Sequence, residues 1–429
     1  MRRISMVGVV VGAALLTSLA SAYAATSGDL DPSFGVGGIV NLENGSGGGA
    51  ESANDVVQMA DGTVFIVGAT VSESSGPRSK WWMLDDGGNP LAAESRFATN
   101  AATGFDTSGE NSIYRAVRGP SGRILLGGFV TRYNDLGDSR VFFQVERLTS
   151  SGSFDPTFSG DGRAITSVGT EGAWVQDLAE QGNGRIVAVG PAVGAAGHEV
   201  IAAVRYTAAG AIDPSFGKNG RVLIDPFGFG GEALGVAIQP DGKVLIAGST
   251  YEPLLPDDTR SYVTVVRLTS NGTRDSTFSG DGIATVQFGA NNAEGADVAV
   301  QSDGRIVVAG TVISSTGNKF ALARLRANGS LDLTFDVDGR VITSFAGGGT
   351  MVEMELGSGG AIYAGGRGAG AVLAKYLISG KLDKTFSGDG RVVVGDLPKP
   401  DGMTLDAEGR VLLVGDGSQG GVSAGRILG

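Results

Sequence analysis

The pattern of apolar and polar positions repeats along the chain at intervals of about sixty residues. A turn residue, a glycine, an apolar run and a second glycine recur seven times, as in DGTVFIVG at 61–68 and DGKVLIAG at 241–248. The first glycines of successive copies are 60, 62, 58, 62, 56 and 49 residues apart. A period sustained over seven copies indicates a repeat architecture.

Each repeat has the hydrophobic pattern of four strands. A short alternating segment, such as ADVAVQ at 296–301, precedes a turn whose Asp-Gly or Asn-Gly is typical of a tight hairpin. A third segment follows a variable loop, such as YVTVVRL at 262–268, and a fourth ends the repeat, such as GRVITSF at 339–345. Four antiparallel strands per repeat are typical of a propeller blade. The sequence therefore predicts an all-β fold, a seven-bladed β-propeller of four-stranded antiparallel blades.

The two ends of the chain carry complementary parts of one blade. A third strand lies at 422–428, whereas 28–41 contains a turn and a fourth strand. Pairing them removes two exposed sheet edges, which otherwise favour aggregation. We therefore expect the N-terminal segment to form the outer strand of the C-terminal blade, with Ile39 and Val40 close to Ile427.

The turn before the fourth strand has the most specific signature. It reads LDPSFGVGG from Leu30, FDPTFSGDG from Phe154, IDPSFGKNG from Ile212, RDSTFSGDG from Arg274, LDLTFDVDG from Leu331 and LDKTFSGDG from Leu382. Together with the D-G-apolar-G segments, these turns resemble the delta-60 repeat family of bacterial β-propeller proteins. The resemblance implies a propeller across the mature chain and no established activity. The first repeat departs from it, because Gly88-Asn89-Pro90-Leu91 stands where Asp and Phe are expected.

The aspartates of these turns allow two interpretations. They are Asp31, Asp155, Asp213, Asp275, Asp332 and Asp383. A ring of carboxylates is suited to metals or catalysis, but a turn aspartate also accepts hydrogen bonds from the backbone two residues on. Because an active site needs one asymmetric constellation, sixfold repetition favours a scaffold in which the Phe of each turn packs inward.

A basic residue precedes the turn aspartate by eight residues in five repeats, at Arg147, Arg205, Arg267, Arg324 and Lys375. The last repeat has Arg426 at this position, and Asp31 would be its partner across the closure. The first repeat has Met83 and no turn aspartate. We predict a charge-assisted bond between each basic residue and a turn aspartate. The alternative is a basic ring that binds anions.

The N-terminus has the order of a secretory signal, with Arg2-Arg3, an apolar run from Met6 to Ala20 and an A-x-A sequence at 22–24. We expect a signal peptide at 1–24, a single propeller domain at 25–429 and a periplasmic or secreted location. The apolar run is shorter than the roughly 20 residues of a membrane-spanning helix, and no comparable run follows. No membrane span is therefore expected.

Composition excludes several kinds of chemistry. The 429 residues include 73 glycines and no cysteine, so disulfides, thiol nucleophiles and zinc–thiolate sites are absent. The formal net charge is −12, and removing the signal leaves 31 basic and 45 acidic residues. Such a chain repels phosphate backbones, so nucleic acid is not an expected partner. We expect a monomer.

No residue can be assigned a catalytic or metal-binding role from sequence. His198 is the only histidine, and nothing near it resembles a nucleophile elbow, which favours a solvated loop residue without partners. Ser-Gly-Asp-Gly turns at Ser159, Ser279 and Ser387 resemble fragments of calcium loops but lack the glutamate that an EF-hand requires. No cofactor is expected, with calcium as the alternative.

The loops that vary most in sequence are the best candidates for a binding site. Loops between strands two and three and between blades share one face of a propeller, while the glycine turns share the other. Because binding sites favour loops on a rigid scaffold, we select Tyr133, Asp135, Tyr251 and Asp257 as candidate ligand-binding residues.

Three functions remain open from sequence. The first is a binding or interaction module for a protein or glycan. The second is a propeller hydrolase or lyase that uses paired carboxylates near the central channel, which need no motif and cannot be located from sequence. The third is a calcium-stabilised structural protein of the cell surface.

Overall fold

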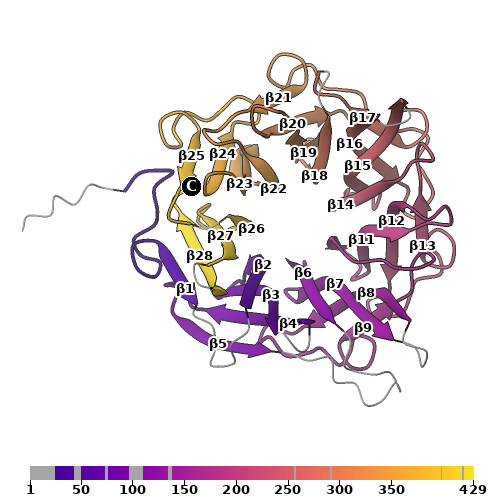
Figure 1. The fold of residues 1–429 in the computed structure, drawn as a ribbon, viewed down its shortest axis with the longest axis horizontal. Coiled ribbons are helices and arrows are strands. Elements are labelled where there is room, and N and C mark those ends of the chain that lie inside the picture. The colour runs from indigo at the N-terminus through magenta and orange to yellow at the C-terminus, as the bar shows by residue number, and fades with distance from the viewer. Residues whose placement is uncertain are drawn as a thin grey trace, which may run out of the picture.

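The computed structural model describes residues 25–42, 50–72, 76–95, 110–133, 138–255, 258–289, 292–397, 399–417 and 420–429. Seven four-stranded antiparallel sheets stand around a central axis (Figure 1). The predicted seven-bladed β-propeller is confirmed. The segment interpreted as a signal peptide, 1–24, lies outside the described residues. Within the described part of the chain, no helix has the length and apolar character that a membrane crossing requires.

In the first six blades the strands follow one another in chain order from the axis outward (Figure 1). The first three blades are β2 (Ala50–Gln58), β3 (Val64–Ser72), β4 (Gly76–Leu84) and β5 (Pro90–Ser95); β6 (Asn111–Arg118), β7 (Ile124–Tyr133), β8 (Ser139–Leu148) and β9 (Arg163–Thr166); and β10 (Asp177–Glu180), β11 (Ile186–Val193), β12 (Glu199–Tyr206) and β13 (Arg221–Ile224).

The next three blades are β14 (Gly231–Ile238), β15 (Val244–Leu255), β16 (Asp258–Leu268) and β17 (Ile283–Val286); β18 (Ala293–Val300), β19 (Ile306–Val312), β20 (Lys319–Leu325) and β21 (Arg340–Thr343); and β22 (Thr350–Leu356), β23 (Ile362–Arg367), β24 (Ala371–Tyr376) and β25 (Arg391–Val394). A short 3-10 turn, Ser358–Gly360, joins β22 to β23.

The seventh blade combines the two ends of the chain. Its strands are β26 (Pro400–Leu405), β27 (Val411–Asp416), β28 (Val422–Ile427) and, outermost, β1 (Ile39–Leu42). Ile39 pairs with Gly425, and a further bridge joins Leu30 to Ile427. The predicted closure of the ring by the N-terminal strand is therefore confirmed.

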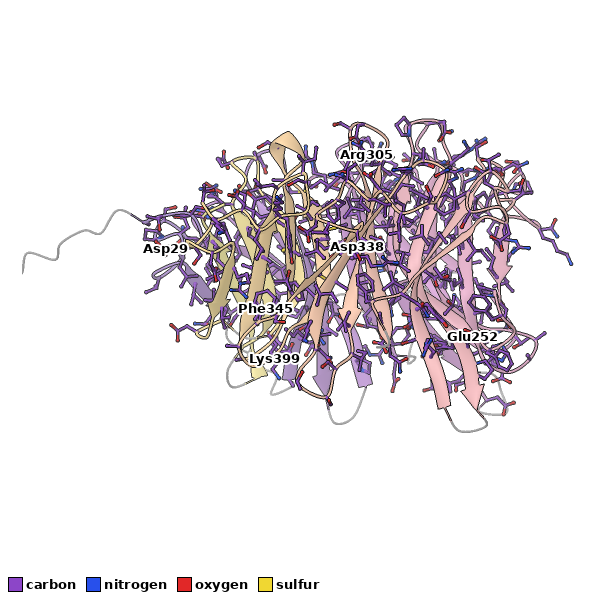
Figure 2. All side chains as sticks on the ribbon, turned by 90° about the horizontal axis from the view of Figure 1, so that it is seen from above. Asp29, Glu252, Arg305, Asp338, Phe345 and Lys399 are labelled. Carbon is purple, nitrogen blue, oxygen red and sulfur yellow. The ribbon has the colours of Figure 1, made fainter. Side chains whose placement is uncertain are left out.

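The strand order places two sets of loops at opposite ends of the ring. The hairpins between strands one and two and the turns between strands three and four lie on one face, which we call the constant face. The remaining loops form the divergent face. Figure 2 shows Arg305, which follows the β18–β19 hairpin, near one end, and Glu252 and Lys399 toward the other.

The core lies between neighbouring blades, where the faces of adjacent sheets pack together. Phe216, for example, belongs to a buried cluster with Val187 of the third blade and Ile246 of the fourth. The six turn phenylalanines are fully buried, as predicted: Phe34, Phe158, Phe216, Phe278, Phe335 and Phe386. Burying one such side chain stabilises the fold by about 1.5–3 kcal/mol.

Candidate functional site

Two of the four candidate ligand-binding residues lie in the described part of the chain, and these two are on different blades. Tyr133 ends β7 in the second blade and is exposed, whereas Tyr251 lies on β15 in the fourth and is half-buried. Asp135 and Asp257 lie outside the described residues. Both tyrosines are on the divergent face, but no hydrogen bond or ring contact joins them in the described part of the chain.

Aromatic and acidic side chains pair on both faces of the fourth blade's sheet, with Tyr251 on one face and Tyr262 on the other. The Tyr251 hydroxyl donates to Glu232 Oε1 at 3.3 Å, and the Tyr262 hydroxyl donates to Glu252 Oε2 at 2.6 Å. The ring of Phe227 lies 6.5 Å from that of Tyr262, centroid to centroid. Burial, together with the charge of Glu232, raises the pKa of Tyr251 above its ordinary value, so this phenol remains a neutral donor.

The loop 225–230 leads from the third blade into the fourth and displays two phenyl rings. Phe227 is 41% exposed and Phe229 is 55% exposed. The Asp225 carboxylate accepts hydrogen bonds from the N–H groups of Gly228, at 2.9 Å, and Gly230, at 3.1 Å. Its other oxygen lies 2.7 Å from Nε2 of His198. This single carboxylate therefore fixes the backbone of the loop that carries the two rings.

The histidine interpretation from sequence was wrong on one point. His198 is half-buried and has a partner, because the chain brings Asp225 to it from the far end of β13. Burial raises the pKa of Asp225, but the hydrogen bonds from His198 and Gly230 outweigh it and hold the pKa below the ordinary value. We call Phe227, Phe229, Tyr262 and Glu252 the aromatic patch.

The channel side of the innermost strands carries a second set of functional groups. One position per blade, seven residues before the first glycine of the hairpin, is occupied by Asp55, Arg115, Asp177, Gly235, Asp297, Glu353 and Gly402. In six of the seven strands the pairing register shifts just before this position, as at Ala53/Asp55 in β2. Such bulges redirect a side chain.

The four carboxylates at this position join neighbouring blades. Asp55 Oδ2 accepts the N–H of Ala116 in the next blade at 2.8 Å, while its Oδ1 accepts that of Val56. Asp177, Asp297 and Glu353 accept the corresponding N–H groups of Val236, Met354 and Met403 at 2.7, 3.0 and 2.8 Å. These bonds give the carboxylates a structural role.

Arg115 bridges the channel. Its Nε lies 2.9 Å from Asp177 Oδ1 in the neighbouring blade, and its Nη1 forms an ion pair with Glu353. Their strands, β6 and β22, face each other across the channel (Figure 1). The same Nε lies 3.6 Å from Asp55 Oδ2 in the first blade, so one guanidinium links four blades and neutralises part of the acidic ring.

Glu355 lies two residues beyond Glu353 on β22, and within the described part of the chain no hydrogen bond or ion pair holds its carboxylate. It lines a channel cavity of about 330 Å³ together with Arg115, Asp177, Asp297 and small apolar residues. Burial and nearby acidic side chains, opposed by Arg115, raise the pKa of Glu355 to about 7. Burial likewise raises the pKa values of Asp55 and Asp297 to about 6. Among the described residues, no three acidic or histidine side chains are placed to hold a metal.

The basic residues of the third strands pair with the turn aspartates of their own blades, as predicted. The N···O distances are 2.9 Å for Arg147–Asp155, 2.8 Å for Arg205–Asp213, 2.9 Å for Arg267–Asp275, 2.8 Å for Arg324–Asp332, 3.5 Å for Lys375–Asp383 and 2.7 Å for Arg426–Asp31. Each turn aspartate also accepts the predicted backbone N–H two residues on, at 2.9 to 3.3 Å.

Each of these arginines reaches one blade further. The Nη1 groups donate to backbone carbonyls in the next blade, at Ala208, Ser270, Ala327, Ile378 and Asp86. Their guanidinium groups also lie over the turn phenylalanines, with Arg426 4.9 Å from the Phe34 centroid. In each of these blades one arginine contacts the Asp, the Ser/Thr and the Phe of the turn motif, which explains all three residues. The repeated arginine–aspartate pairs are therefore part of the scaffold.

Comparison with known proteins finds several solved structures and one family model that resemble this chain. No curated protein matches the sequence. Solved structures that resemble it include the β-propeller domain of the Trilobed protease from Pyrococcus furiosus (10% identity, 86% of this chain and 92% of that one, TM-score 0.46), an ulvan lyase of polysaccharide lyase family PL25 bound to a saccharide (8%, 89% and 94%, 0.48) and a PQQ-bound aldose sugar dehydrogenase from Streptomyces coelicolor (14%, 77% and 97%, 0.42).

A family model supplies the more specific match. The model described as "Domain of unknown function (DUF5122) beta-propeller" matches residues 119–158, 181–216, 239–278 and 301–335. Each segment runs from the first hairpin of a blade to the phenylalanine of its turn motif, and so contains both sequence signatures. The chain is therefore a β-propeller whose second to fifth blades match the repeat that this family model describes.

Proposed function

We propose that this protein is a binding module that recognises a glycan through the aromatic patch. The observation that carries the proposal is the loop 225–230, in which one carboxylate holds two exposed phenyl rings in place beside acidic side chains. Exposed apolar side chains that gather together beside polar groups are typical of a ligand-binding or interaction surface. A fixed loop loses little conformational entropy on binding, which favours affinity.

The chemistry of the aromatic patch suits a sugar. Aromatic faces pack against the C–H surface of a pyranose ring, and carboxylates accept hydrogen bonds from its hydroxyls. Glu252 is exposed within the patch, and Glu232 is half-buried on the other face of the same blade. Burial raises the pKa values of Glu199 and Glu294 nearby, and the charge of Glu232 adds to the effect. This concentration of acidic groups disfavours polyanions, so a neutral or amino-bearing glycan is the expected ligand class.

Titration calorimetry with a panel of soluble neutral, amino-bearing and sulfated polysaccharides tests the proposal. Binding to at least one neutral or amino-bearing polymer is expected, and Phe227→Ala/Phe229→Ala should weaken it at least tenfold without changing the melting temperature. Tyr133→Ala is the matched control, because Tyr133 is exposed on the same face of a different blade. If the control variant loses as much affinity as the double variant, the site is elsewhere on this face.

A second candidate, a hydrolase or lyase of the channel, is favoured by one observation. Glu355 is a carboxylate with a pKa of about 7 that lines the channel cavity near Arg115. A group poised near neutral pH suits general acid or base catalysis. Release of reducing ends or unsaturated uronates from the same polysaccharides, abolished by Glu355→Gln, would favour this function. Binding without turnover would favour the first.

We also propose export to the periplasm or the cell exterior, on the strength of the signal-like residues 1–24. The remaining blades are interpreted as diverged copies of the repeat, which resembles the delta-60 repeat. Cell fractionation of the tagged full-length chain tests the location, and mass spectrometry of the mature N-terminus tests cleavage after Ala24.

A further inference from the structure

The repeats act as internal controls for one another, and at one channel position the sixth blade departs from all the others. This position lies two residues nearer the constant face than the position of Asp55 and Arg115. Its residues in the seven blades are Val57, Val117, Ala179, Ala237, Ala299, Glu355 and Thr404. Because six blades have an uncharged side chain here, the fold does not require a carboxylate at this position.

Glu355 also differs from the other channel carboxylates in its contacts. Asp55, Asp177, Asp297 and Glu353 each accept a backbone N–H from the next blade. Within the described part of the chain, no hydrogen bond or ion pair holds the carboxylate of Glu355. An ionised carboxylate without a partner in mostly apolar surroundings destabilises a protein, and the raised pKa of Glu355, about 7, reflects this. A cationic ligand that pairs with it would remove the penalty.

The cavity of about 330 Å³ beside Glu355 has mostly apolar walls. Ala179, Ala237 and Ala299 line it at the level of Glu355, together with larger apolar residues such as Leu356. Alanine is the smallest side chain found at this position and leaves room beside the carboxylate. Apolar walls with a few polar groups are typical of small-molecule sites of this volume.

The charged groups of the cavity favour a cationic ligand. The carboxylates of Asp177, Asp297 and Glu355 line it, together with the guanidinium of Arg115. Arg115 is already ion-paired with Asp177 and Glu353. An anion would therefore be repelled, whereas the field of the carboxylates concentrates cations.

The groups that line the cavity also narrow the class of cation. Divalent metals bind several oxygen ligands at once, and in the described part of the chain no three acidic or histidine side chains are placed to hold one. Quaternary ammonium ions are typically held by aromatic rings, and none of the residues that line this cavity is aromatic. A primary ammonium group needs only hydrogen-bond acceptors for its N–H donors, and its aliphatic chain suits apolar walls.

We propose that the channel cavity binds a primary ammonium group on an aliphatic chain, with the Glu355 carboxylate as its counter-ion. The aliphatic chain lies against Ala179, Ala237 and Ala299. Such a group belongs to a free aliphatic amine or to a lysine side chain of a partner. The site does not depend on the aromatic patch, which lies on the divergent face. It gives Glu355 a binding role in place of the acid–base role of the second candidate function.

Titration calorimetry at pH 8, where Glu355 is largely ionised, tests the site with n-hexylamine. Hexylamine should bind at one site per chain, and n-hexanol, which has the same chain without the charge, should bind at least tenfold more weakly. Nα-acetyl-lysine methylamide distinguishes the two sources. Tighter binding than hexylamine favours a lysine side chain, and weaker binding favours a free amine. If neither ammonium compound binds at millimolar concentration, the proposal is overturned.

Two variants locate the site. Glu355→Gln should weaken hexylamine binding at least tenfold, and Ala237→Leu should do the same by filling the cavity while the carboxylate remains. A cooperative melting transition without ligand shows that each variant folds. Glu408→Gln is the matched control, because it removes the same charge from a constant-face side chain that is 63% exposed. Wild-type affinity in Glu355→Gln, or an equal loss in the control, overturns the proposal.

The same measurements separate the channel site from the glycan site. Phe227→Ala/Phe229→Ala should bind hexylamine as the wild type does, since the loop 225–230 lies on the divergent face. A chain that binds a polysaccharide but not hexylamine refutes the channel site alone. Calcium chloride that binds where hexylamine does not, and whose binding is lost in Glu355→Gln, would show a metal site and overturn the proposal.

Discussion

Replacing Arg426 with methionine removes the guanidinium that joins the two ends of the chain. Arg426 is 1% exposed. Its Nε lies 2.7 Å from Asp31 Oδ2, its Nη2 donates to the Ser33 hydroxyl at 2.9 Å, and its Nη1 donates to the Asp86 carbonyl at 2.6 Å. The variant would leave the buried Asp31 carboxylate and the Asp86 carbonyl without these donors, while the methionine keeps part of the packing.

The expected cost is about 3 kcal/mol. Breaking a buried ion pair by removing one partner typically costs 3–5 kcal/mol. The lower end applies, because Arg410 also lies near Asp31, at 3.4 Å, and compensates part of its charge. Arg305→Met is the matched control, since Arg305 pairs with its own turn aspartate, Asp332, but its side chain is 41% exposed. Its loss should cost about 1 kcal/mol or less.

Urea unfolding followed by tryptophan fluorescence measures the difference. Trp82 is a suitable probe, because it packs in one cluster with Leu412 and Ala424 across the closure. For Arg426→Met the urea concentration at the midpoint of unfolding should fall, with little change in the slope of the unfolding free energy against urea concentration. Combining Arg426→Met with Asp31→Asn should cost less than the two single changes added together, because no charge is then left buried. The reasoning would be refuted if the free energy of unfolding of Arg426→Met lay within about 1 kcal/mol of that of the wild type, or if the costs of Arg426→Met and Asp31→Asn were strictly additive.

Three further predictions concern the channel and the loop. Glu355→Gln should stabilise the protein by roughly 3 kcal/mol near pH 8 and hardly at all near pH 5. Burial raises the folded-state pKa of Glu355 to about 7, so its contribution to the free energy of unfolding is present below its unfolded-state pKa and is lost as the pH rises through about 7. Equal shifts of the melting temperature at both pH values would contradict this prediction. Gly402→Ala should lower the free energy of unfolding by about 1–3 kcal/mol, because a Cβ at this position would lie 2.4 Å from the Cα of Asp55. A Cβ at Gly182 would meet nothing within 4 Å, so Gly182→Ala should leave urea unfolding unchanged. Asp225→Ala should increase amide hydrogen exchange in 225–230 at least tenfold, with no change in the other blades; unchanged exchange would show that the carboxylate does not hold the loop.

The sequence predicted those features that recur at a fixed offset. Seven blades, the closure at Ile39 and the pairs such as Arg147–Asp155 all follow from comparing one repeat with the next. The channel position was missed because its residue type changes from blade to blade, from Asp55 to Arg115 to Gly235, although its distance from the hairpin glycine is constant. That constant distance was the available signal.

Features that depend on a single blade could not be predicted. Phe227 and Phe229 are exposed, whereas the loop phenylalanines of the next two blades, Phe288 and Phe345, are buried, and only the fold brings His198 to Asp225. The first blade was expected to lack the charge pair, and it does have Met83, yet Asp86 in its turn accepts two bonds from Arg426. The contact exists because the first and seventh blades meet at this point of the ring, and the pattern within one repeat does not predict such a contact.

The strand order of the seventh blade has a consequence for biosynthesis. Asn41 of β1 and its partner Ser423 of β28 are 382 residues apart in the chain. At 5–20 residues per second, β1 is made roughly 20–80 s before the strand that it pairs with. During this interval the other blades can form in order, but β1 has no sheet to join. A ribosome that stalls before β28 therefore releases an open chain with a free edge strand, which a protease or a holding chaperone can recognise as unfinished.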